Sequence, residues 1–187
     1  MQEIEVKLPV KSPATMRRRL RQLGFRLLVH RLFERNLVLD TPQGAMRQSL
    51  QLLRLRSKGG RWWITWKGRP ETGRRHKVRA EIDLQIPHGE QIREILHYLG
   101  YRAAFEYQKY RTEFRRASEK GKAVLDETPI GNYLELEGPA AWIDRTAREL
   151  GYDPSDYILA SYSSLYLDWC IRHGRSPGNM VFKGKSA

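Results

Sequence analysis

The chain has 187 residues, which is enough for one hydrophobic core and lies within the usual size range of a single domain. Its 40% apolar and 10% aromatic residues argue against a disordered chain, and no segment approaches the roughly 20 apolar residues that a membrane span needs. The formal net charge of +13 predicts a polyanionic partner, such as a nucleic acid, a polyphosphate, a nucleotide or an anionic membrane surface, without choosing among them.

The N-terminal segment and the cysteine content predict a cytoplasmic protein with no membrane association. The segment MQEIEVKL carries charge from its third residue and has no apolar run, so it does not read as a secretory signal peptide. Cys170 is the one cysteine of the chain and cannot form an internal disulfide, which fits a reducing compartment. We expect this cysteine to lie in the core, on the last helix.

Helices are predicted from signals at their ends. The first, for example, follows Ser12 and Pro13, a capping serine and a proline at the first helical position, and it ends before Gly24. The later helices carry apolar residues at helical spacing, and two of them also end before a glycine. The predicted helices cover residues 14–23, 89–99, 139–150 and 153 to about 174.

The segments between these helices alternate polar and apolar residues with period two, as strands with two unlike faces do. About eight such segments occur, enough to close a barrel: residues 3–8, 33–39, 51–57, 62–67, 75–86, 107–115, 122–126 and 132–137. One face of nearly every segment is polar, with Glu3, Glu5, Lys7, Arg54, Arg56, Thr65, Lys67, Lys77, Arg79, Glu81, Asp83, Lys109, Arg111, Glu113, Glu135 and Glu137.

Two interpretations account for these charged faces. Antiparallel sheets commonly have one wet face, and alternation alone shows no more than that. However, long charged side chains are poorly favoured in strands, and the other face carries bulky residues such as Trp62, Trp66 and Phe114. Carboxylates also cluster on the first, middle and last strands, with Arg and Lys on the strands between them. We therefore predict an α+β fold: a closed antiparallel barrel of eight strands around a charged tunnel, with helices packed outside.

The acidic residues of this tunnel predict a metal site. Carboxylates at alternate positions of a strand lie side by side, which pairs Glu3 with Glu5, Glu81 with Asp83, and Glu135 with Glu137. Hard divalent cations take such oxygen ligands, and Mg²⁺ typically combines one or two carboxylates with waters and substrate phosphate oxygens. Neighbouring Arg and Lys side chains would hold a polyanion. Together these groups indicate metal-assisted phosphoryl transfer.

The order of these motifs resembles the CYTH domains, or triphosphate tunnel metalloenzymes. The ExExK motif of that family is matched by Glu3, Glu5 and Lys7. Further matches follow in family order up to residue 167: FERNLVLDTP, LLRLR, TWKG, KVRAEID, EYQKYRTEF and LDETPIGNYLELEG. ExExK alone would be a weak signal, but the ordered set is specific. The resemblance implies an eight-stranded barrel in which glutamates hold one or two Mg²⁺ or Mn²⁺ ions and cationic side chains grip a triphosphate.

The resemblance also assigns roles to individual residues. The expected metal ligands are Glu3, Glu5, Glu81, Asp83, Asp126, Glu135 and Glu137. The expected phosphate-binding residues are Lys7, Arg54, Arg56, Lys67, Lys77, Arg79, Lys109 and Arg111. We assign catalysis to Lys7, Glu5 and Arg56. Asp83 stands in place of a third glutamate, which shortens that ligand by one methylene group.

Activities within the family include inorganic triphosphatase, thiamine triphosphatase, class IV adenylyl cyclase and RNA 5′-triphosphatase. Hydrolysis needs a water aimed at the terminal phosphate, whereas cyclisation needs a ribose 3′-oxygen aimed at the α-phosphate, and hence a nucleoside site. The segment 34-ERNLVLDT-41 lacks the His-Phe-Asp stretch of the cyclase branch. We therefore expect a metal-dependent triphosphatase acting on inorganic triphosphate, ATP or thiamine triphosphate. The alternatives are an adenylyl cyclase making cyclic AMP and pyrophosphate, or a non-catalytic barrel that binds polyphosphate or RNA 5′-triphosphate.

The domain is expected to cover residues 1–174, followed by a basic tail over 175–187. Residues after 167 extend past the resemblance, and their apolar spacing fits either a docked helix or a dimer contact. A monomer and a homodimer therefore both remain open. The last five residues, KGKSA, are expected to fray.

Overall fold

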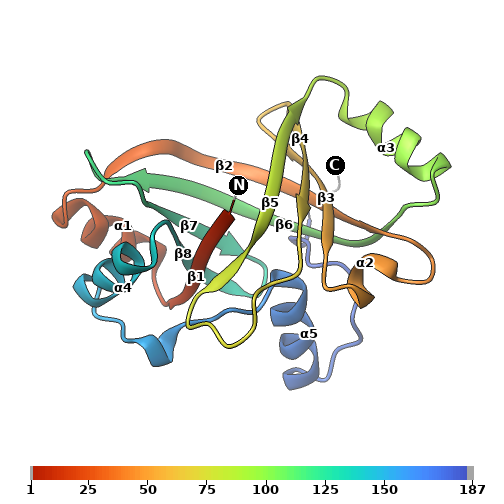
Figure 1. The fold of residues 1–187 in the computed structure, drawn as a ribbon. Coiled ribbons are helices and arrows are strands. Elements are labelled where there is room, and N and C mark those ends of the chain that lie inside the picture. The colour runs from red at the N-terminus through yellow and green to blue at the C-terminus, as the bar shows by residue number, and fades with distance from the viewer. Residues whose placement is uncertain (1, 185–187) are drawn as a thin grey trace.

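Eight antiparallel strands close into a barrel, which confirms the predicted fold class (Figure 1). The structure, a computed structural model, describes residues 2–184. Around the barrel the strands follow the order β1-β5-β4-β3-β2-β6-β7-β8. They are β1 Gln2–Val10, β2 Arg26–Asp40, β3 Leu52–Lys58, β4 Arg61–Lys67, β5 Lys77–Ile86, β6 Arg102–Arg115, β7 Lys122–Thr128 and β8 Gly131–Glu137.

The helices lie outside the barrel. They are α1 Pro13–Gln22, α2 Ala45–Gln48, α3 Gly89–Tyr98, α4 Ala140–Glu149, the 3₁₀ helix η1 Pro154–Asp156 and α5 Tyr162–Arg172. Helices α1, α3 and α4 confirm the predicted segments to within one residue at each end, and Ser12 caps α1 as expected by accepting a hydrogen bond from the backbone N–H of Thr15. Every helix in the described residues is too short or too polar to cross a membrane.

The fourth predicted helix is wrong, because residues 153–174 form two helices with an extended linker between them. Asp153 caps only the single turn of η1. Ile158 then pairs with Lys7 of β1, donating its backbone N–H to the Lys7 carbonyl at 2.9 Å and accepting the Lys7 N–H at 3.0 Å. Ser161 starts α5 by capping the N–H of Ser164. Tertiary pairing with β1 therefore overrides the helical pattern of this segment.

Strands β2 and β6 are much longer than predicted. The period-two pattern indicated residues 33–39 and 107–115, but the strands have 15 and 14 residues. They pair along most of their length, with register shifts between Leu27 and Val29 and between Val29 and Leu32. Such irregularities break the alternation of side chains, which explains why the pattern failed to reveal the first part of β2.

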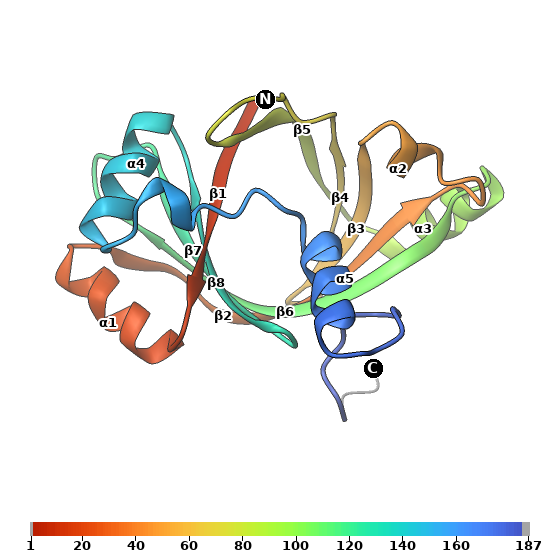
Figure 2. The same cartoon turned by 90° about the horizontal axis from the view of Figure 1, so that it is seen from below.

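The apolar core lies outside the barrel, between the strands and the helices. Figure 2 shows α1 and α4 on one side and α2 and α3 on the other. Val6, Leu8 and Val10 of β1 point outward and pack with residues of α1 and α4, such as Leu20 and Ile143. A second cluster joins β2, β3 and β4 to α3. Since the apolar faces are buried outside, the inner faces of the strands are left to polar residues.

The segment after α5 packs against β6. Met180 is fully buried, accepts the backbone N–H of Gln108 at 2.9 Å and donates its own N–H to the Glu106 carbonyl at 2.9 Å. Cys170 of α5 is buried, as predicted. Met180 thus joins the segment after α5 to β6, while the last three residues of the tail lie outside the described residues.

Candidate active site

A charged cavity of about 710 Å³ lies inside the barrel. Every site residue expected from the sequence lines this cavity except Asp126. The residues come from β1, β3, β4, β5, β6 and β8, so strands far apart in the sequence contribute to one set of walls. The alternation of each strand places the charged side chains inward, and the closure of the barrel brings them together.

Three carboxylates form an acidic cluster on adjoining strands. Glu5 of β1 lies opposite Glu137 of β8, and Glu135 lies two residues away on the same strand. One carboxylate oxygen from each residue lies within 4.8 Å of those from the other two, which suits shared ligation of a divalent cation. Burial raises the pKa of Glu137, although Lys122 opposes the shift. Burial also acts to raise the pKa of Glu5, but Lys7 and Lys77 outweigh it and the pKa is lowered.

Cations surround this acidic cluster, defined as Glu5, Glu135 and Glu137. The Lys7 ammonium lies 3.4 Å from Glu5 and 3.3 Å from Glu135. The Lys77 ammonium lies 3.2 Å from Glu5, and burial, with a further contribution from Lys7, lowers its pKa to about 8. The site therefore holds its cations close to the carboxylates rather than on a separate wall.

The other expected carboxylates of the cavity are each engaged by cations. Lys67 lies 2.6 Å from Glu3 and 3.2 Å from Glu81. Asp83 pairs with Arg56 at 3.1 Å and accepts a hydrogen bond from the Thr65 hydroxyl. The structure thus separates the expected metal ligands into the acidic cluster and a second group on β1 and β5 that is compensated by the chain's own cations.

Asp126 is placed differently from the other expected ligands. Its side chain is fully buried and does not line the cavity. Among the described residues, the group of carboxylates close enough to share a metal ion does not include it. Lys109 lies 2.8 Å from one oxygen, Arg111 engages both oxygens at 2.6 and 2.7 Å, and the Tyr162 hydroxyl donates at 2.7 Å. Because both carboxylate oxygens already accept hydrogen bonds from these donors, Asp126 holds Lys109 and Arg111, two of the expected phosphate-binding residues, in place.

Glu34 is a charged residue of the barrel interior that the sequence analysis missed. It is fully buried on β2, lies opposite Lys58 of the neighbouring strand β3 and is 3.3 Å from the Lys58 ammonium. Lys58 also pairs with Glu113 of β6 at 2.8 Å. Burial acts to raise the pKa of Glu34, but Arg111 and Lys109 outweigh it and lower the pKa to about 2. Glu34 and Asn36 stand two residues apart within the predicted strand 33–39, and this spacing was the signal that could have revealed it.

Two further groups of residues line the cavity. Three of them, Arg115, Lys120 and Lys122, are basic. Other lining residues are apolar or carry hydroxyl groups: Val38, Leu52, Tyr107, Ser161, Tyr162 and Ser163. The contribution of α5 was not predictable from the strand pattern, because it depends on the break in the expected fourth helix.

Comparisons with known proteins agree with this architecture. In sequence, the chain is 28% identical over 138 residues to a Methanocaldococcus jannaschii protein named "Putative adenylate cyclase MJ0240", covering 73% of this chain and 77% of that protein. A solved structure of a similarly named Vibrio parahaemolyticus protein has a TM-score of 0.76 at 21% identity, covering 87% of this chain and 96% of that chain. HpAC1 from Hippeastrum, for which a dominant triphosphatase activity is described, has a TM-score of 0.64 at 16% identity, covering 94% of this chain and 97% of that chain.

These structural likenesses show a shared fold, and the family follows from the sequence itself. A profile of the CYTH domain matches residues 1–162, a range that includes all eight strands of the barrel. Proteins of this family are metal-dependent in general, in agreement with the acidic cluster. The chain therefore belongs to the CYTH domain family.

Proposed function

We propose that this protein is a divalent-metal-dependent phosphohydrolase that cleaves inorganic triphosphate or a small organic triphosphate inside the barrel. The proposal rests mainly on the approach of Glu5, Glu135 and Glu137 to within 4.8 Å of one another in a cavity that also contains many cations. Carboxylates alone would repel a polyphosphate, and cations alone would bind it without activating it. Their combination in one cavity is what metal-assisted phosphoryl transfer requires.

The acidic cluster fits Mg²⁺ or Mn²⁺, because both are hard cations that prefer carboxylate oxygens. Glu137 supports this fit, since burial raises its pKa and a bound cation would favour the ionised form. When bound, such a cation would neutralise phosphate charge and lower the pKa of a coordinated water. We assign Glu5, Glu135 and Glu137 as its ligands, with Glu3, Glu81 and Asp83 compensating the neighbouring cations.

The cations of the chain would hold the substrate. Arg54 and Arg56 offer planar guanidinium groups that suit bidentate contacts with phosphate oxygens, and Lys109 and Arg111 are held in place by Asp126. Lys67, Lys77 and Arg79 complete the expected phosphate-binding set. Lys7 lies next to two members of the acidic cluster. We assign catalysis to Lys7, Glu5 and Arg56, which would offset the charge on the phosphoryl group during its transfer.

Product analysis tests this proposal. Purified protein is incubated with Mg²⁺ or Mn²⁺ and with triphosphate, ATP or thiamine triphosphate, and phosphate, pyrophosphate and cyclic AMP are measured separately. We expect phosphate release that EDTA abolishes and that Glu5→Gln reduces by at least about 100-fold. Glu90→Gln, on the exposed surface of α3, is the matched control and should keep wild-type turnover.

Adenylyl cyclase activity is a second candidate, favoured by the name of the Methanocaldococcus jannaschii relative. Formation of cyclic AMP together with pyrophosphate from ATP would replace the hydrolase proposal by this one. A third outcome would indicate a non-catalytic binding protein: no substrate is turned over, and Glu5→Gln and Glu137→Gln leave the binding of polyphosphate or of an RNA 5′-triphosphate intact.

A further inference from the structure

Strand β5 has an open edge beyond the point where β1 covers it. The pairing of β1 with β5 runs from Glu5 opposite Lys77 to Gln2 opposite Ala80. On the other side, β4 pairs with β5 as far as Ile86. In the described part of the chain, no residue pairs with 82–86 on the β1 side. This stretch of β5 therefore has one neighbour rather than two, in an otherwise closed barrel.

The direction of the backbone groups along this edge follows from one hydrogen bond. The N–H of Gly68 donates to the carbonyl of Ala80, so Ala80 is in a hydrogen-bonded position towards β4. Hydrogen-bonded and non-hydrogen-bonded positions alternate along an antiparallel pair, so the backbone N–H and C=O groups of Ile82 and Leu84 also point towards β4. Asp83 and Gln85 then direct theirs at the open edge, where they can accept another strand.

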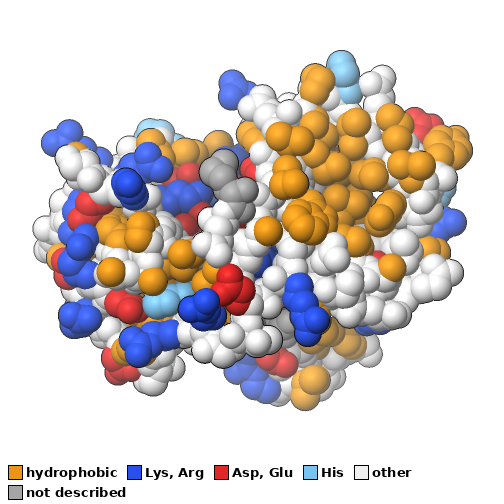
Figure 3. Space-filling view, in the orientation of Figure 1, with side chains coloured by type: hydrophobic (Ala, Val, Ile, Leu, Met, Phe, Trp, Pro, Cys, Tyr) orange, Lys and Arg blue, Asp and Glu red, His pale blue; other side chains and the backbone are white. Residues whose placement is uncertain are grey.

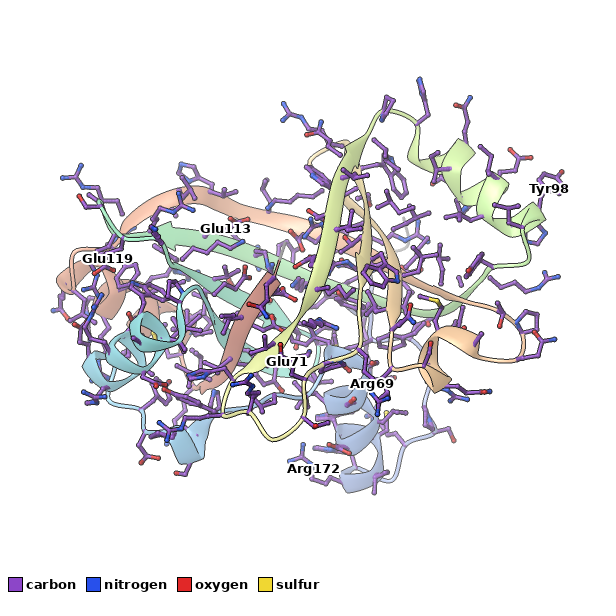
Figure 4. The ribbon with its side chains drawn as sticks, viewed as in Figure 1. Arg69, Glu71, Tyr98, Glu113, Glu119 and Arg172 are labelled. Atoms are coloured by element: carbon purple, nitrogen blue, oxygen red, sulfur yellow. The ribbon has the colours of Figure 1, made fainter. Side chains whose placement is uncertain are left out.

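The outer face of the same stretch is apolar. Ile82 and Leu84 are 52% and 56% exposed, because the alternate residues Glu81 and Asp83 line the cavity. Figure 3 shows apolar side chains spread over β4, β5 and α3. On α3 the exposed apolar residues are Ile95 and Tyr98, and Tyr98 projects from the outer end of the helix (Figure 4). A monomeric protein rarely exposes a contiguous apolar patch larger than a few hundred Å² without using it.

A second strand, β2, also extends beyond one of its neighbours, but its sequence and shape oppose pairing with another chain. The β5 edge lacks such protection. The first part of β2, residues 26–33, extends past β3, but it contains register shifts and carries Arg26, His30 and Arg31. Bulges and basic side chains are the usual means of preventing edge-to-edge pairing. The register of β5 with β4 has no shift, and the outward residues of 82–86 are all apolar.

Charge indicates which partner suits this face. Glu81 and Asp83 line the cavity, and of the remaining charged residues in 80–99 the exposed Glu90 and Glu94 outnumber the single cation Arg93, in a chain of net charge +13. An anionic membrane or a nucleic acid would bind the basic faces in preference to this one. Two copies of the chain repel each other through their basic surfaces, so they can approach most closely through this face.

We infer that the β5 edge is a homodimer interface, in which two copies pair antiparallel across a two-fold axis through residues 82–86. An antiparallel strand edge is complementary to itself under such an axis, and the two apolar patches would join into one buried surface. The register with Leu84 opposite its own copy sets Asp83 opposite Gln85 and Ile82 opposite Ile86. A register centred on Asp83 would place two carboxylates together and is disfavoured.

Disulfide trapping tests the interface and its register. Leu84 occupies a non-hydrogen-bonded position of the new pair, where Cα atoms lie about 4.5 Å apart and a disulfide fits. Two copies of Leu84→Cys should cross-link when diamide oxidises their thiols, and native Cys170 does not interfere because it is buried. Ile171→Cys, at a 76% exposed position of α5, is the matched control and should remain uncross-linked. Preferential cross-linking of Ile82→Cys would overturn the register.

Solution mass tests the dimer without a cross-link. Protein tagged at its C-terminus, so that no added residues extend β1 along β5, should sediment as a dimer. Leu84→Lys places two ammonium groups opposite each other and should raise the dimer dissociation constant at least about tenfold. Ile171→Lys should leave it unchanged, and both variants should keep the wild-type melting temperature of the monomer.

Two results would overturn the inference. One is a wild-type protein that stays monomeric at concentrations up to about 100 µM. The other is a dimer that Leu84→Lys leaves intact while Ile171→Lys dissociates it, which would assign the interface to α5 instead.

Discussion

Glu5 on β1 lies directly opposite Glu137 on β8, so the barrel holds two carboxylates against each other across neighbouring strands. Like charges in this position normally destabilise a sheet. Glu135 joins them within 4.8 Å, while Lys7 adjoins Glu5 and Glu135. This placement of like charges on neighbouring strands is the reason that we propose a divalent cation at the acidic cluster.

The members of the acidic cluster should differ in their effect on the metal-free protein. Burial raises the pKa of Glu137, whereas that of Glu135 is lowered because Arg111 and Lys7 outweigh the burial. In EDTA, we expect Glu137→Gln to be neutral or to stabilise the protein by about 1 kcal/mol. Glu135→Gln removes one carboxylate partner from each of two buried cations, Lys7 and Arg111, and should lower the free energy of unfolding by about 3 kcal/mol. Urea denaturation measures both.

Both variants should also weaken Mn²⁺ binding in calorimetric titrations, while Glu90→Gln should not. Equal destabilisation by the two substitutions in EDTA would contradict the assigned difference in environment.

Asp126→Asn should separate a positioning role from metal ligation. The substitution releases Lys109 and Arg111 from their shared carboxylate, so the unfolding free energy should fall by about 3 kcal/mol and KM for triphosphate should rise. The Mn²⁺ dissociation constant should rise much less than with Glu5→Gln, because all three carboxylates of the acidic cluster remain. Tyr162→Phe removes a single hydrogen bond to Asp126 and should lower the unfolding free energy by about 1 kcal/mol. A loss of metal affinity as large as that of Glu5→Gln would identify Asp126 as a ligand.

Glu34 should make stability depend on acid pH. Its pKa in the folded protein is about 2, below the ordinary value of 4.5, because Arg111 and Lys109 outweigh the burial. The stabilising contribution of this group is therefore complete above pH 4.5 and is lost as the pH falls towards 2. Glu34→Gln should lower the unfolding free energy at pH 7 by about 3 kcal/mol and flatten its dependence on pH in this range. A wild-type pH profile for this variant would show that Glu34 is not engaged by its cationic neighbours.

The linker between η1 and α5 should support β1. Ile158 and Lys7 exchange two backbone hydrogen bonds, so Ile158→Pro removes the donor to the Lys7 carbonyl. We expect a loss of about 1–2 kcal/mol in unfolding free energy and a lower kcat, because Lys7 and Glu5 share this strand. Leu159→Pro, at the next and more exposed position, is the comparison. Equal activity in both variants would indicate that the catalytic strand does not depend on this pairing.

Much of the site was predictable because its charged residues alternate with apolar residues along single strands. Glu3, Glu5 and Lys7 stand two residues apart, and a strand places such residues on one face whatever its partners are. The same argument placed Glu135 and Glu137 correctly inside the barrel. It missed Glu34 because Arg35 interrupts the alternation of polar and apolar residues around it.

The sequence by itself determined the number of strands, the inward face of most of them and the chemical class of the cavity, since side-chain direction in a strand depends only on the local backbone. The tertiary structure decided the rest. Closure of the barrel selected Glu5, Glu135 and Glu137 as one cluster, because β1 pairs with β8 across more than 120 residues of sequence. It also buried Asp126 behind Lys109 and Arg111, and it broke the last predicted helix so that Ile158 could pair with β1. These outcomes depend on pairing between distant segments, whose register no local pattern specifies.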